Sequence, residues 1–135
     1  MKIPKDDPAE AHIRRVRRFC TSLHEVTEKL SHGAPTFFAR KRVFAMVSNN
    51  HHNDGHVAVW IPAAPGVQGA LIKSDPRVYY RPPYVGPSGW VGIELDQIGD
   101  EELAIHLREA YDLVLAKQKT GKPKKPGLIR KAPAR

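Results

Sequence analysis

The chain has 135 residues, 41% of them hydrophobic, and a formal net charge of +8, which predicts one domain with a real core. No apolar run approaches the roughly 18 residues that span a bilayer, and the first residues lack the apolar segment of a secretory signal. The single cysteine, Cys20, excludes a disulfide within the chain, so we expect a cytoplasmic protein without a membrane partner.

The positive excess is confined to the C-terminal end. Of the 22 Lys and Arg, eight lie from residue 117 onward, where there is no Asp or Glu. The other 14 lie in 1–116, where their formal charge is balanced by 14 acidic residues. The stretch after Thr120 contains Pro, Gly and Lys and almost nothing to bury. We predict a folded domain over 1–117 and a disordered basic tail over 118–135.

The first half of the chain predicts a helix followed by strands. Pro8 suits a first helical turn, and Ile13, Val16 and Cys20 fall on one apolar stripe. A short second helical turn is expected around 25–30. Strands rich in valine and aromatic residues follow at 36–39, 42–48 and 56–61, and the last two are joined by a polar reversal over 49–55.

The second half predicts a short helix at 65–74, strands at 77–81 and 89–95, and a long final helix. Asp100 is expected to cap that helix, whose buried stripe is Leu103, Leu107, Ala110 and Val114. The fold class is therefore α+β. We expect a two-layer sandwich, with an antiparallel sheet of about five strands and the N- and C-terminal helices on one face.

Several motifs in this order resemble the MmcQ/YjbR family. They are Val26-Thr27-Glu28, the aromatic pair Phe37-Phe38, Pro83 to Gly86, Gly89 to Val91, and Tyr111 in the closing helix. The resemblance covers about residues 10–117. It implies a fold similar to bacterial frataxin and a DNA-binding role. It carries over no catalytic residue and no iron site, because the first helix is rich in arginine where frataxins are acidic.

Positive charge and aromatic surface are the features that could bind DNA. Lys and Arg in the tail would neutralise phosphates, and arginines on the first helix and at the 40–42 turn could add a basic edge. By strand alternation, Trp60 and Trp90 point away from the helices, towards an open sheet face suited to base stacking. The expected contact residues are Arg14, Arg15, Arg18, Arg40, Lys41, Arg42, Trp60, Trp90, Lys122, Lys124, Lys125, Arg130 and Lys131.

Other readings remain open at this point. The arginines could be a solvated face paired with local acids, and the sheet face could bind a protein partner or a second copy. An enzyme would need a pocket near Glu28, Tyr84 and Trp90. The histidines at 51, 52 and 56 suit a polar turn better than a metal site. Cys20 suits the core better than a nucleophile's position. We expect a non-enzymatic DNA-binding protein without cofactor or metal.

Overall fold

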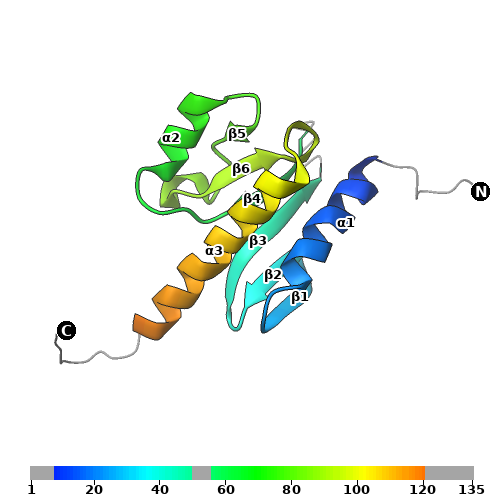
Figure 1. Ribbon diagram of the computed structural model, residues 1–135, viewed down its shortest axis with the longest axis vertical. Coiled ribbons are helices and arrows are strands. Elements are labelled where there is room, and N and C mark those ends of the chain that lie inside the picture. The colour runs from blue at the N-terminus through cyan, green and yellow to red at the C-terminus, as the bar shows by residue number, and fades with distance from the viewer. Residues whose placement is uncertain (1–7, 50–55, 121–135) are drawn as a thin grey trace, which may run out of the picture.

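The computed structural model describes residues 8–49 and 56–120 (Figure 1). Its six-stranded sheet has the order β1-β2-β3-β4-β6-β5, and every neighbouring pair is antiparallel. The helices are α1 (Pro8–Thr21), α2 (Val67–Ser74) and α3 (Asp100–Thr120), and the strands are β1 (Val26–Ser31), β2 (Ala34–Ala39), β3 (Arg42–Asn49), β4 (Val57–Ile61), β5 (Tyr79–Tyr80) and β6 (Val91–Glu94).

The two terminal helices cover one face of the sheet, which confirms the α+β sandwich. Figure 1 shows α3 running across the strands with α1 beside it. The predicted stripes are buried: Ile13, Val16 and Cys20 on α1, and Leu103, Leu107, Ala110 and Val114 on α3. They pack on the inward side chains of the sheet, among them Phe37, Val59 and Ile93, which are fully buried. Burying one such side chain contributes about 1.5–3 kcal/mol.

The sheet has six strands, where about five were expected, because β1 was read as a helical turn. That prediction around 25–30 is wrong. Val26 to Ser31 pair with the whole of β2, and the reversal at His32 and Gly33, with φ of 52° and 81°, suits a tight hairpin. A window of six residues is too short for periodicity to separate helix from strand. Pairing with β2 decided the outcome.

The final helix is longer than the predicted domain. It continues to Thr120, beyond the expected boundary at 117. The side chain of Gln118 holds this end of the helix against the turn between β2 and β3. Its Nε2 donates to the Ala39 carbonyl at 2.9 Å, and its Oε1 accepts from the Lys41 backbone N–H at 3.5 Å. The start of the basic tail is therefore anchored beside a basic turn.

The sheet opens at the opposite end of β3. Pairing between β2 and β3 stops at Thr36–Met46, yet β1 and β2 stay paired to Ser31–Ala34, and β3 and β4 stay paired to Asn49–Val57. Pro35 has no backbone N–H to donate to a ladder, and the Ala34 carbonyl accepts from the Thr36 hydroxyl at 3.1 Å instead. The start of β2 and the end of β3 therefore diverge.

Candidate functional site

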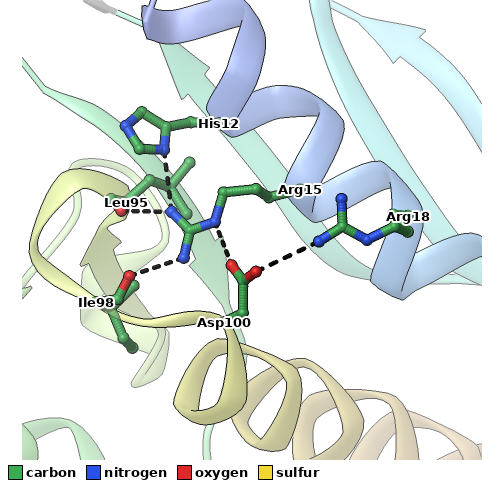
Figure 2. A network of polar contacts seen from close by, with 6 residues as sticks. All are labelled: His12, Arg15, Arg18, Leu95, Ile98 and Asp100. Carbon is green, nitrogen blue, oxygen red and sulfur yellow. Dashed lines mark hydrogen bonds and ion pairs between the residues drawn. The ribbon is translucent and has the colours of Figure 1, made fainter.

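The arginines of α1 were expected to form a basic edge, but Arg15 points inward and joins α1 to the start of α3 (Figure 2). Its guanidinium donates to the carbonyls of Leu95 and Ile98, each at 2.7 Å, and to the Asp100 carboxylate at 2.6 Å. Only 16% of the Arg15 side chain is exposed. Arg15 is therefore engaged within the fold, and little of its side chain is left for a phosphate to contact.

His12 and Arg18 belong to the same network. The Nη1 of Arg15 lies 3.0 Å from Nδ1 of His12, and both burial and the Arg15 charge lower the pKa of His12. A neutral imidazole that accepts this hydrogen bond is consistent with both effects. Arg18 is exposed and reaches the other Asp100 oxygen at 3.4 Å, so part of its charge is compensated. Asp100, expected as a helix cap, thus receives two arginines.

Arg17 and Glu28 connect α1 to β1 through two hydrogen bonds. Nε and Nη2 of Arg17 donate to the two carboxylate oxygens at 2.9 and 2.8 Å. This contact lowers the pKa of Glu28, although partial burial opposes the shift. A carboxylate with a lowered pKa is a weaker base, so the arrangement does not favour Glu28 as a general base. Arg14, in contrast, is exposed on α1.

The turn after β2 is the part of the predicted basic edge that faces outward. Arg40 bonds Glu25 at 2.6 Å, which lowers the pKa of that exposed carboxyl. Lys41 and Arg42 are exposed, and neither is ion-paired to a carboxylate among the described residues. With Lys117 at the adjacent end of α3, they form one region, which we call the basic corner: Lys41, Arg42 and Lys117. Lys122, Lys124, Lys125, Arg130 and Lys131 lie outside the described residues.

The two tryptophans do not form an exposed stacking platform. Trp60 is only 5% exposed, and its Nε1 donates to the Tyr80 hydroxyl at 2.8 Å. Trp90 comes before β6 and is half-buried, and its carbonyl accepts from Gln68. Alternation correctly gave Trp60 the face opposite the helices, but it could not reveal that other side chains cover that face.

Tyr80 and His56 supply much of this cover. Gly92 lies opposite Tyr80, and a Cβ on Gly92 would be only 2.5 Å from the Tyr80 ring, so glycine lets the ring lie flat across β6. The His56 ring stacks on Tyr80 with centroids 4.3 Å apart, and its Nδ1 contacts the Glu94 carboxylate. Sequence reasoning missed this cluster. The alternation that placed Trp60 also places His56 on the same face, so the position of His56 could have been predicted from the sequence, but its stacking on Tyr80 could not.

The remaining candidates for chemistry are enclosed or incomplete. Cys20 is fully buried, and burial together with the Glu28 charge raises the pKa of its thiol, as expected for a core cysteine. Within 8–49 and 56–120, no three His, Cys, Asp or Glu side chains are grouped as metal ligands. The histidines at 51 and 52 lie outside those ranges. No helix in the described part is long and apolar enough to cross a membrane.

A cleft occupies the place where β2 and β3 diverge. It has a volume of about 800 Å³ and is bordered by α1, the β1–β2 turn, the end of β3 and the loop around Tyr84. An enzyme would have needed a pocket near Glu28, Tyr84 and Trp90. This cleft is lined by Tyr84 but not by Glu28 or Trp90. Tyr84 is 70% exposed and Leu30 is 74% exposed, so two large apolar side chains stand at its border.

Comparison with known proteins gives the family. No curated protein matches the chain. The crystal structure of Deinococcus radiodurans protein DR2400, a DUF419 domain, is similar with a TM-score of 0.67 and 21% identity, over 81% of this chain and 82% of that one. At this identity the likeness shows the shared α+β fold. A family model described as YjbR matches residues 21–113, so the chain belongs to the YjbR family.

Proposed function

We propose that this protein binds DNA without catalysing a reaction, and that the basic corner and the C-terminal segment form one binding surface. The observation that carries the proposal is the attachment of Gln118 to Ala39 and Lys41. Gln118 thereby places the described end of α3 beside the β2–β3 turn, where Lys41 and Arg42 face outward. Charges separated by about 80 positions in the sequence are thereby brought together.

Electrostatics supports this surface over the α1 arginines. Lys41 and Arg42 have no carboxylate partner among the described residues, whereas Arg15 and Arg17 each bond one. An arginine that already holds a carboxylate must lose that contact before it can bind a phosphate. Unpaired lysines and arginines release condensed counterions from DNA at no such cost. Of the predicted basic residues within the described domain, the proposed surface therefore keeps Lys41 and Arg42, and it adds Lys117.

A non-catalytic role is supported by the state of the best catalytic candidates in the described chain. Glu28 is held by Arg17, and Cys20 is buried with a raised pKa. Binding that depends on charge needs neither a nucleophile nor a general base. It needs accessible cations on a body that does not neutralise them.

The test is the salt dependence of DNA binding by the full chain. Fluorescence anisotropy with a labelled duplex should give an affinity that falls steeply as salt rises, with the logarithmic slope decreasing by about 0.9 for each phosphate contact removed. The variant Lys41→Gln/Arg42→Gln should lower the slope by about 2, and deletion of residues 121–135 should lower it further.

The matched control is Lys73→Gln/Arg77→Gln, which removes the same formal charge near α2. Lys73 and Arg77 are both exposed, so the fold should tolerate the change. This control should leave the salt slope close to that of the wild type. An equal effect of the two double variants, or duplex binding that does not respond to salt, would contradict the proposed surface.

A further inference from the structure

We propose that the cleft between β2 and β3 binds an uncharged, mainly apolar small molecule that carries a hydrogen-bonding group. This site is separate from the basic corner, which lies at the other end of β3. Its volume of about 800 Å³ falls within the range of small-molecule pockets, roughly 300–1,000 Å³. Its lining comes from both sides of the sheet, because the strands are unpaired there.

The lining is mainly apolar. Met46 and Trp60 contribute from the face opposite the helices, and Ile13 contributes from α1. Leu30 and Tyr84 border the opening, and they are two of the three large apolar side chains that are exposed in the described part of the chain. Exposed apolar groups that gather around a concave region are typical of ligand sites, whereas scattered ones are not.

Ser48 provides an independent sign of a ligand. Ser48 is one of the residues that line the cleft and is only 4% exposed, and among the described residues its buried Oγ has no hydrogen-bond partner. Buried hydroxyls are nearly always satisfied, so a hydroxyl without a protein partner in a residue of the cleft leaves a hydrogen bond that a polar group of a ligand would make. A hydroxyl can donate one hydrogen bond and accept others, so it suits an N–H or a carbonyl.

The charges at the cleft favour an uncharged ligand. Glu10 and Arg17 both line it, and Arg17 is already bonded to Glu28. Among the described lining residues, an anionic ligand would therefore meet the Glu10 carboxylate, and the Arg17 guanidinium there is already bonded to a carboxylate outside the cleft lining. Desolvating a charged group in this apolar surrounding would add a further penalty. These features together select the class of ligand named above.

The test uses N-phenylnaphthylamine as the probe, a neutral aromatic amine with one N–H whose fluorescence rises in apolar surroundings. The full chain should bind it saturably, with one site per chain. Anilinonaphthalene sulfonate has the same ring system with a negative charge, and it should bind at least tenfold more weakly. Equal binding of both probes would indicate a general apolar surface and would overturn the proposal, as would the absence of saturable binding.

Two variants locate the site. Leu30→Glu should weaken binding of the neutral probe at least tenfold, whereas Ile105→Glu, at the third exposed apolar side chain, should leave it unchanged. Ser48→Ala should weaken binding about fivefold, the usual range for one hydrogen bond. Circular dichroism verifies that each variant is folded. If Ile105→Glu matches Leu30→Glu, or if Ser48→Ala binds as tightly as the wild type, the assignment of this site is wrong.

Discussion

Two arginine-rich regions of the molecule look alike in sequence and differ in what they contact. On α1, Arg15, Arg17 and Arg18 all reach carboxylates, and Arg15 also bonds two backbone carbonyls. At the β2–β3 turn, Arg40 is paired, but Lys41 and Arg42 face solvent without a described carboxylate partner. The first region connects elements of the fold, and the second leaves charge available. The number of positive residues alone does not indicate which of them can bind a polyanion.

The largest expected effect that tests this difference between the two regions is a loss of stability when Arg15 is replaced. Replacing it with Ala removes the donor from the Leu95 and Ile98 carbonyls and from Asp100, so we expect a loss of about 2–3 kcal/mol in the free energy of unfolding. Urea denaturation measures it. Arg14→Ala, next to it on the same helix and exposed, is the matched control and should change stability by less than about 0.5 kcal/mol.

The same pair of variants also tests the division of roles. Under conditions where Arg15→Ala is folded, its DNA salt slope should equal that of the wild type, because Arg15 already serves the fold. A lowered slope for Arg15→Ala would mean that the α1 arginines bind DNA and that the two regions are not distinct.

A smaller, pH-dependent effect is expected at Glu28. Its pKa is lower in the folded protein than in the unfolded chain, so the ionised carboxyl stabilises the fold above the unfolded value of about 4.3. This contribution disappears as the pH falls through the folded pKa. Because both side chains are partly exposed, we expect Glu28→Gln to cost about 1 kcal/mol at pH 7. The difference from wild type should shrink in acid.

Denaturation at a series of pH values measures this difference. Glu101→Gln removes the same charge from an exposed side chain at the start of α3 and serves as the control. A Glu28→Gln deficit that stayed constant down to pH 3 would show that the hydrogen bonds of the charged pair are not its cause.

The smallest effect on stability is expected at the basic corner. Lys41→Gln/Arg42→Gln should change the free energy of unfolding by less than about 0.5 kcal/mol, because both side chains are exposed. The same variant should nevertheless give the clear decrease in salt slope described above. A large loss of stability would instead assign these side chains a structural role like that of Arg15.

Features that depend on residues close together in the sequence could be predicted, whereas features that depend on contacts between distant segments could not. Helices α1 and α3 were predicted from single stripes of apolar residues, since that pattern is local and each stripe is buried as expected. The sixth strand was missed because Val26 to Ser31 carry no clear period, and only pairing with β2 defines them. The proposed cleft was also beyond prediction, because it depends on where pairing between β2 and β3 stops.

The sequence by itself determined the α+β class, the two terminal helices, the inward position of Cys20 and the basic character of the C-terminal end. These follow from composition and from periodicities within one element. Tertiary structure alone decided that Asp100 would engage Arg15, that Tyr80 and His56 would cover Trp60, and that Gln118 would hold the end of α3 beside Lys41. Such contacts join residues far apart in the chain, and no local pattern specifies which charge or ring will meet which partner.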